Sequence, residues 1–361
     1  MKRNVYFCNC NHFKTKFMHL FKQHSAGALL FFVMLLSLFG CKRKQQRVTL
    51  FDQVSYPYAT YYKGNYYYTM QDYNHKKVEL WKTNDLKKLP KANSKTIFPT
   101  TDSMRSKVHN VWSPELHRIG NKWYIYFEFD DGNTDDHQLY VLENDSDDPM
   151  EGEFRLHGPI ITNKDWNWGI HPSSIVINGQ QYLVWSGWQH RRIDVEVQCI
   201  FIAKMKNPWT LASQRVKISQ PDYEWERQWI SADGASTAYP IYVNENPEIM
   251  LSADGRNVII YYSASGCWTT YGSLGMLTAP VGSDLLNPRN WKKSAEPIFS
   301  SIPNDGIFSP SNICIVNGEQ GTPPELLYET KYFVNGQMRK DVRLKTISYD
   351  NNGFPIFGKP L

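Results

Sequence analysis

Tryptophan side chains are the first residues in this sequence whose chemistry suggests a ligand. The 361-residue chain contains 12 Trp and 22 Tyr. A flat aromatic face packs well against the apolar C–H face of a sugar ring. Seven tryptophans are candidates for such a surface: Trp112, Trp166, Trp168, Trp188, Trp225, Trp229 and Trp268. They indicate carbohydrate binding, and the alternative for any single Trp is packing between structural elements.

The elements that must position these side chains share one sequence phrase. Within residues 112–127, a Pro is followed after six residues by Gly and then by alternating aromatic and aliphatic residues. This pattern is typical of a strand that turns at Gly and returns as a buried strand. The phrase recurs at five prolines, each with a Gly six to eight residues later: Pro57, Pro114, Pro172, Pro247 and Pro310.

The spacing of these prolines predicts the fold. Neighbouring prolines are 57 to 75 residues apart, about the length of a four-stranded blade with its loops. Five such units predict an all-β, five-bladed β-propeller, with an irregular β-sandwich as the alternative. Proline suits the first residue of each innermost strand, where its missing N–H costs no ladder bond. We expect the inner strands to converge on one channel whose mouth is lined by Tyr56, Glu115, His171, Glu245 and Ser309.

The N-terminal segment has the composition of an export signal. Residues 1–40 carry five Lys or Arg and no acidic residue, and the apolar run from Ala26 to Phe39 ends at Gly40-Cys41. This resembles a bacterial lipobox, so we predict a lipoprotein signal peptide at 1–40, a lipid on Cys41 and a position in the bacterial cell envelope on an unspecified face of the membrane. An ordinary secreted protein is the alternative, and Met18 is a second candidate start.

Removal of that signal changes the charge of the chain. Without residues 1–40 the formal net charge falls from +5 to zero. No basic stripe is left that could follow a phosphate backbone, which argues against nucleic acid as a partner. We predict a polar tether at 41–50 and a single propeller domain at 51–361, joined to the membrane through the lipid anchor.

Three cysteines remain beyond Cys41, and their spacing does not suggest a metal site. We expect Cys199, Cys267 and Cys314 to be buried small hydrophobes, with one disulfide as the alternative in an oxidising compartment. Nothing in the sequence predicts a metal or a cofactor.

Several motifs resemble glycoside hydrolase family 43, whose members are five-bladed propellers that cleave arabinose and xylose linkages. The likeness covers nearly the whole chain after the signal. It rests on Trp112-Ser113-Pro114-Glu115-Leu116-His117 and on residues 136–143, 185–188, 262–268 and 350–360. The motifs of the third and fourth blades resemble those of the arabinofuranosidase-like branch. The resemblance implies a plant-type polysaccharide or oligosaccharide as partner, with hydrolysis by inversion.

Inverting hydrolysis requires specific carboxyl groups. One carboxylic acid protonates the leaving oxygen, and a carboxylate roughly 6.5–9.5 Å away activates water. A third carboxylate keeps the pKa of the acid high. By the resemblance, Glu245 in Asn244-Glu245-Asn246-Pro247 stands at the place of the acid. Tyr56 and His171 stand where the family has the Asp base and the Asp that tunes the acid.

Two further positions depart from the family. Ser309 stands where many members have a His that holds a cation or water, and Tyr328-Glu329-Thr330 replaces a Tyr-His-Ala motif. We expect substrate contacts from Trp112, Glu115, Trp168, Trp268 and Ser309.

These substitutions bear on activity. A phenol with a pKa near 10 is a poor base at neutral pH, and loss of a positioned base costs about 10²–10⁴ in rate. The chain is then either a glycosidase with rewired acid–base groups or a catalytically silent sugar-binding propeller, and a scaffold without ligand is a third possibility. An Asp from a loop could replace the missing base; the candidates are Asp52, Asp165, Asp222, Asp233 and Asp305.

Overall fold

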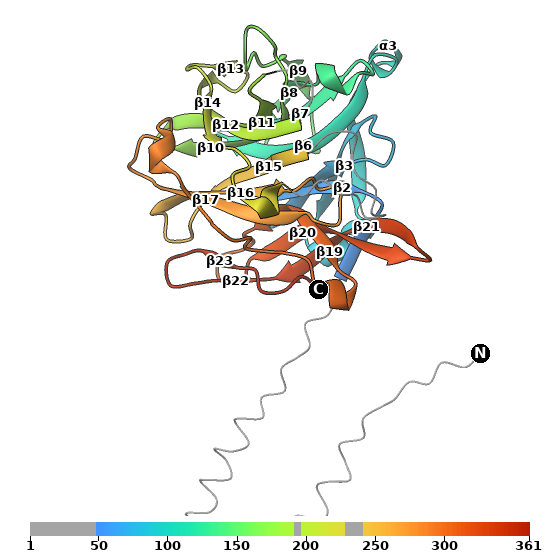
Figure 1. Cartoon of the computed structure of the whole chain (residues 1–361). Helices are drawn as coiled ribbons and strands as arrows, with labels where there is room; N and C mark the ends of the chain where they lie inside the picture. Colours follow the sequence, from blue (N-terminus) through green and yellow to red (C-terminus); the bar gives the residue numbers. More distant parts are fainter. Residues whose placement is uncertain (1–47, 191–195, 228–240) are drawn as a thin grey trace, which may run out of the picture. The chain divides into compact units, whose positions relative to one another are not determined.

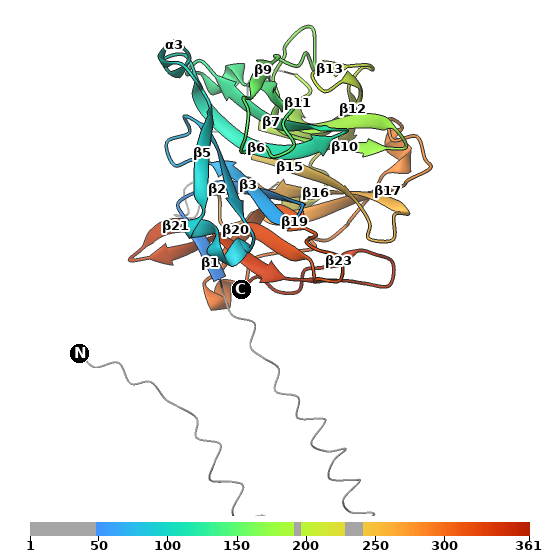
Figure 2. The ribbon, with the colours of Figure 1, turned by 180° about the vertical axis from the view of Figure 1, so that it is seen from behind.

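The computed structural model describes residues 48–190, 196–227 and 241–361, and strands dominate them (Figures 1 and 2). These described residues belong to one compact unit. The predicted signal peptide and Cys41 lie outside the described residues. Within the described ranges, no helix is both long and apolar enough to cross a bilayer.

Five groups of antiparallel strands follow one another along the chain. The first blade contains β2 (Ser55–Tyr62), β3 (Asn65–Gln71), β4 (Val78–Thr83) and β5 (Asn93–Phe98). The second contains β6 (His109–Ile119), β7 (Lys122–Asp130), β8 (Gln138–Asn144) and β9 (Arg155–His157). The third contains β10 (Ile170–Ile177), β11 (Gln180–Trp188), β12 (Glu196–Asn207), β13 (Thr210–Leu211) and β14 (Val216–Ser219).

The last two blades complete the ring. The fourth contains β15 (Ile241–Leu251), β16 (Asn257–Ala264), β17 (Ser273–Pro280) and β18 (Lys292–Lys293). The fifth contains β19 (Phe308–Val316), β20 (Glu325–Val334), β21 (Gln337–Thr346) and, at its edge, β1 (Val48–Asp52). A two-stranded sheet of β22 (Ser348–Tyr349) and β23 (Pro355–Ile356) follows. The inner strands β2, β6, β10, β15 and β19 contact one another in that order, and β19 contacts β2. The predicted all-β, five-bladed propeller is confirmed.

Short helical turns lie in the connections between strands. They are α3 (Asp102–Arg105), η1 (Leu86–Lys91), η2 (Thr134–Asp136), η3 (Glu224–Glu226), η4 (Pro288–Asn290) and η5 (Pro303–Asp305). Two blades are also linked directly, because β12 pairs in parallel with β15 at Gln198 and Val243. The third and fourth blades therefore form one continuous nine-stranded sheet.

The N-terminal boundary of the domain differs from the prediction. β1 begins at Val48, inside the segment 41–50 for which the sequence predicted a tether. β1 pairs with β21, so Val48 lies opposite Leu344 in the fifth blade. The last three residues of the predicted tether therefore belong to the folded domain.

The five repeated prolines lie in the five inner strands, but each follows the start of its strand rather than opening it. β2 begins two residues before Pro57, and β15 begins six residues before Pro247. The pairing register shifts at every one of these prolines. Proline has no backbone N–H to donate to a neighbouring strand. A β-bulge leaves a residue unpaired at that point, so proline fits inside the strand without loss of a hydrogen bond.

The residue before each proline has an unusual backbone. Its φ is positive in all five blades: Tyr56 at 53°, Ser113 at 35°, His171 at 54°, Asn246 at 50° and Ser309 at 47°. Non-glycine residues rarely adopt this left-handed conformation, which costs roughly 1–3 kcal/mol at each position. One strained bulge is therefore repeated around the inner end of the propeller.

Apolar side chains fill the spaces between neighbouring blades. Ile200 and Ile202 of the third blade, for example, share one buried cluster with Ile260 and Leu277 of the fourth. The three cysteines within the described residues are buried, as expected, and each is a free thiol.

Candidate active site

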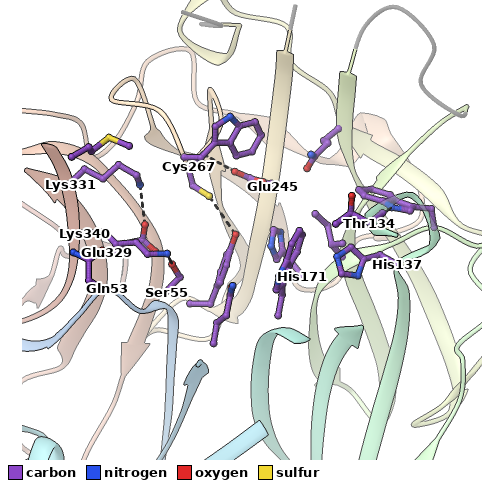
Figure 3. Close-up of a pocket in the computed structure, with 18 of the residues that line it drawn as sticks. Gln53, Ser55, Thr134, His137, His171, Glu245, Cys267, Glu329, Lys331 and Lys340 are labelled. Atoms are coloured by element: carbon purple, nitrogen blue, oxygen red, sulfur yellow. Dashed lines mark hydrogen bonds and ion pairs between the residues drawn. The ribbon is translucent and has the colours of Figure 1, made fainter. Parts of the chain in front are cut away.

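A cavity of about 510 Å³ opens where the inner strands converge (Figure 3). Tyr56, His171 and Glu245 all line it, so the structure brings together the three positions to which the family resemblance assigns acid–base roles. Strands β2, β10 and β15 supply them, and all three lie in or next to the repeated bulge. The bulge directs these side chains toward the common cavity.

Glu245 is a buried carboxyl group in this cavity. Its side chain is 1% exposed, and Oε1 accepts a hydrogen bond of 2.8 Å from the backbone N–H of Cys267. Cys267 follows β16, the strand that pairs with β15. A carboxyl group held in this way can donate a proton to a leaving oxygen, which is the role that the resemblance assigns to Glu245.

Tyr56 cannot serve as an ordinary base. Burial, reinforced by the nearby Cys267 and Glu245, raises the pKa of the Tyr56 phenol well above its usual value. Its hydroxyl lies 3.4 Å from Sγ of Cys267. The phenol therefore stays protonated at neutral pH and takes no proton from water.

His171 is a neutral side chain whose ring packs against Tyr56 at an interplanar angle of 34°. The two ring centroids are 4.7 Å apart, and Nδ1 of His171 accepts a hydrogen bond of 3.2 Å from the backbone N–H of Asn246. Burial, and next the nearby His137, lower the pKa of His171 to about 3. Because His171 is uncharged at neutral pH, it neither lowers the pKa of Glu245 as a cation would nor replaces the negative charge of the missing Asp.

A second buried carboxyl group, that of Glu128, lies next to this histidine. Oε1 of Glu128 is 3.9 Å from Nε2 of His171 and accepts a 2.7 Å hydrogen bond from Ser113. Burial raises the pKa of Glu128 to about 8 despite that bond. Glu128 is 0% exposed and is not among the residues that line the cavity, so it is no candidate for activating water there.

Aromatic side chains form one wall of the cavity. Trp112, Trp168, Trp188 and Trp268 line it. Trp168 and Trp188 stack with centroids 3.8 Å apart and planes 5° apart, whereas Trp268 is 41% exposed. Trp168 and Trp188 therefore hold each other in place, and Trp268 is the most exposed of these tryptophans.

The remaining candidate tryptophans have other positions. Trp166 packs against Trp188, with ring centroids 5.1 Å apart, and Trp225 stacks on Tyr262 at 6.4 Å. Neither is among the cavity-lining residues. Trp229 lies outside the described residues.

Glu115 and Ser309 do not line the main cavity, in contrast to the predicted arrangement of the channel mouth. Glu115 borders a smaller cavity, and its Oε2 lies 3.0 Å from Nε2 of His117. Ser309 is fully buried and donates a 3.4 Å hydrogen bond to the carbonyl of Cys267. Both side chains pack into the structure around the cavity rather than into its open space.

The structure adds a charged wall that sequence reasoning did not assign to the site. Glu329, Lys331 and Lys340 of the fifth blade line the cavity. Figure 3 shows them on the opposite side of Cys267 from Thr134 and His137. The altered motif Tyr328-Glu329-Thr330 was a signal for this wall, but its place in the cavity depends on the pairing of β20 with β21, which the motif does not reveal.

Glu329 is an ionised carboxylate. Burial would raise its pKa, but Lys331 and Lys340 outweigh that effect and hold the pKa below its usual value. Oε1 lies 3.0 Å from Nζ of Lys331, and Oε2 accepts a 3.0 Å hydrogen bond from Asn312. Glu245 and Glu329 are the carboxyl groups among the described cavity-lining residues.

The loop aspartates considered as replacement bases do not belong to this set. Asp52, Asp165, Asp222 and Asp305 are exposed and are absent from the described lining. Asp233 lies outside the described residues. Across the described ranges, no cluster of three or more His, Cys, Asp or Glu has the geometry to hold a metal ion.

Comparison with known proteins relates this site to a family of enzymes. The family "Glycosyl hydrolases family 43" matches residues 48–355. An extracellular exo-alpha-(1->5)-L-arabinofuranosidase of Streptomyces avermitilis is 31% identical over 307 residues, which cover 82% of this chain and 60% of that protein. An enzyme of the same name from Streptomyces chartreusis is 30% identical over 273 residues, with 75% and 77% of the two chains covered. The chain thus spans about 60% of the length of the first of these relatives.

Solved structures agree with the sequence match. The alpha-L-arabinofuranosidase from Lactobacillus brevis aligns with a TM-score of 0.75 at 28% identity and covers 86% of this chain and 96% of its own. A thermostable family-43 glycoside hydrolase aligns with a TM-score of 0.66 at 19% identity, covers 88% and 98% of the two chains, and supports the fold alone. With its family match extending through all five blades, this chain belongs to glycoside hydrolase family 43.

Proposed function

We propose that this protein recognises arabinose- or xylose-containing glycans in the cavity and acts on them as a glycoside hydrolase, with Glu245 as the proton donor. The observation that carries the proposal is the buried carboxyl group of Glu245 among the lining residues of a cavity that four tryptophans also line. A sugar stacked on that wall would present its glycosidic oxygen to Glu245. The names of the relatives favour a terminal α-L-arabinofuranosyl group as the substrate.

The reaction should be slow with ordinary substrates. Tyr56 stays protonated and His171 stays neutral at neutral pH, so neither supplies the negative charge that the family places at these positions. Loss of a positioned base alone costs about 10²–10⁴ in rate. Glu329 is ionised, but its pairing with Lys331 makes it a weak acceptor for a proton from water.

Restoring the two carboxylates tests this proposal. The double variant Tyr56→Asp/His171→Asp should hydrolyse 4-nitrophenyl α-L-arabinofuranoside at least about 100-fold faster than the wild type, because base and pKa-tuning group act together. Asp tolerates a positive φ better than most residues, so both backbone sites accept the change. Each single variant should gain little.

Glu245→Gln provides the control. Introduced into the double variant, it should abolish the gained activity, because no proton donor remains. Rapid turnover by the wild type that Glu245→Gln removes would show that another base exists and that the predicted slow reaction is wrong.

A silent sugar-binding protein is the second candidate, favoured by the burial of Tyr56 and its contact with Cys267. In that case neither wild type nor double variant hydrolyses aryl arabinosides or xylosides, yet arabinan or arabinoxylan still binds. Trp112→Ala or Trp168→Ala should then weaken binding by about 1 kcal/mol or more. If the double variant hydrolyses the aryl glycosides and the wild type binds the polysaccharides, the cavity is a hydrolase site, and the hydrolase is favoured over the silent binder.

We further propose that residues 1–40 are a lipoprotein signal peptide and that Cys41 carries a lipid that anchors the domain in the bacterial envelope. The basic start, the apolar run and the Gly40-Cys41 junction support this. Mass spectrometry of the native protein should find a lipidated Cys41 at the mature N-terminus. A Cys41→Ala variant that remains in the membrane fraction would contradict the proposal.

A further inference from the structure

Charge is distributed unevenly over the cavity. All the Lys and Arg residues among its described lining, Lys331, Arg339 and Lys340, come from the hairpin of β20 and β21. The described lining contains two carboxyl groups, Glu245 and Glu329. One side of the cavity is therefore cationic, and the side formed by the second and third blades is aromatic.

The hairpin projects beyond its neighbours in the sheet. β19 pairs with β20 as far as Lys331, and β1 pairs with β21 from Asp341 onward. The strand pairing of the part between them, which includes Arg339, lies within the hairpin, apart from a 3.0 Å hydrogen bond that the carbonyl of Lys340 accepts from the backbone N–H of Gln53. Figure 1 shows the hairpin extending from the body of the domain. An Asn335-Gly336 turn with φ of 51° and 77° closes it tightly.

Two of the lysines are direct cross-strand partners. Lys331 lies opposite Lys340 in the register of β20 and β21, so both side chains leave the same face of the hairpin. Like charges directly opposite each other destabilise the pairing of two strands. Both lysines stabilise the ionised Glu329, but with Arg339 the hairpin brings three cations to the lining against that one carboxylate, which leaves a surplus of positive charge for a ligand.

Glu329 compensates only part of this charge. It forms a 3.0 Å ion pair with Lys331, both side chains being buried. Nζ of Lys340 donates to the neutral hydroxyl of Ser55, and the guanidinium of Arg339 donates to the neutral amide of Gln337 at 3.2 Å. Within the described residues, neither Lys340 nor Arg339 has a carboxylate at ion-pair distance, and both are among the residues that line the cavity.

We propose that this wall, formed by Lys331, Arg339 and Lys340, is a subsite for an anionic group carried by the glycan, either the carboxylate of a uronic acid or a sulfate ester. Arginine and lysine bind both groups through charge-assisted hydrogen bonds. The sugar bearing the anion would lie on the fifth-blade side, while a neighbouring sugar stacks on the tryptophans. This inference rests on the proposed glycan-binding function and specifies the class of glycan.

Calorimetric titration of the full-length wild type with three probes tests the subsite. The probes are a xylo-oligosaccharide bearing one glucuronic acid, the same compound with its carboxyl group reduced to an alcohol, and a xylo-oligosaccharide bearing one sulfate ester. At least one anionic probe should bind about tenfold tighter than the neutral one at low ionic strength, and the advantage should shrink as salt rises. Whichever anionic probe binds more tightly shows whether the subsite prefers a carboxylate or a sulfate ester.

Two variants locate the effect. Arg339→Gln and Lys340→Gln should each reduce the advantage of the anionic probe to about threefold or less while affinity for the neutral probe stays within about twofold. Lys331 is left unchanged because its removal would leave Glu329 buried and unpaired. Lys91→Gln, at an exposed lysine of η1 in the first blade, is the matched control and should leave all affinities unchanged.

The outcomes separate the two proposals. If the neutral probe binds and neither anionic probe binds more tightly, the anionic subsite is wrong and the proposed function stands. If an advantage persists in both variants, the anion binds elsewhere and the subsite is again wrong. If no probe binds the wild type, the proposed glycan-binding function itself fails.

Discussion

One backbone position decides which side chains reach the site. In each blade the residue before the repeated proline has a positive φ, and at Tyr56 and His171 this conformation turns the side chain into the cavity. Ser309 has the same backbone, yet its side chain packs so closely against Gly272 that a Cβ on that glycine would lie 2.0 Å from its Oγ. The same bulge can therefore direct a side chain into the cavity or bury it, depending on whether open space or a packed neighbour such as Gly272 faces that side chain.

Burial also controls the protonation of the histidines near the cavity. It lowers the pKa of His117, His137 and His171 to about 3 in each case. In the unfolded chain a histidine has a pKa near 6.5. Between pH 6.5 and pH 3 the unfolded chain therefore binds more protons than the folded protein. The contribution of these histidines to the free energy of unfolding is fully present above pH 6.5 and is lost as the pH falls toward 3.

His137→Phe tests this pH dependence at one residue. Phenylalanine keeps a flat ring against Trp112, whose centroid lies 4.2 Å from that of His137. Without the titrating group, the loss of unfolding free energy between pH 6.5 and pH 3 should be shallower by up to about 1.4 kcal/mol per pH unit. Urea denaturation at several pH values measures the slope. His190→Gln, at an exposed histidine, should leave it unchanged, and equal slopes in all three proteins would refute the explanation.

The sequence predicted the residues of the site unevenly. Tyr56, His171 and Glu245 line the cavity as expected, because Tyr56 and His171 directly precede a proline of the repeated phrase and Glu245 stands two residues before one. Glu115 follows its proline, and its side chain borders a different cavity. Lys331 and Lys340 could not be assigned, since they become neighbours only when β20 pairs with β21. The local proline phrase pointed to these three positions, whereas the charged wall depends on the pairing of two strands.

At the scale of single elements, the fourth blade contains a tight contact between two strands. Gly275 of β17 lies opposite Tyr262 of β16, and a Cβ on Gly275 would be 2.1 Å from Cζ of the tyrosine. The tyrosine hydroxyl donates a 2.8 Å hydrogen bond to the buried Glu226, which also accepts from Asn244 at 2.9 Å. The ring is fixed at both ends, and Asn244 directly precedes Glu245.

Gly275→Ala should therefore destabilise the protein. The added methyl group must displace a ring that its hydrogen bond holds in place, with an expected loss of about 1–3 kcal/mol in the free energy of unfolding. Gly282→Ala is the matched control, because a Cβ there meets nothing within 4 Å. It should change stability by no more than about 0.5 kcal/mol. Urea denaturation compares them, and equal stabilities would show that the ring moves freely.

At the scale of the whole molecule, the ends of the domain meet in one blade. β1 forms the outer edge of a sheet whose other strands come from residues 308–346. The repeated prolines allowed five blades to be predicted, but the closing strand escaped prediction because its partner β21 lies almost a full chain length away. Its short apolar stretch also follows a run of basic residues, a context typical of a tether.

This closure predicts how the molecule responds to a change in β1. Leu50 is 6% exposed and packs in a cluster that contains Tyr68 of the first blade and Leu344 of the fifth. Leu50→Ala should cost about 2–5 kcal/mol, because it leaves a cavity between the first and last blades. Leu156→Ala, in the outer strand β9 where the side chain is 37% exposed, should cost far less. Thermal and urea unfolding compare the stabilities of the two variants. Equal losses of unfolding free energy would mean that β1 contributes little to the stability of the propeller and that the other strands close it.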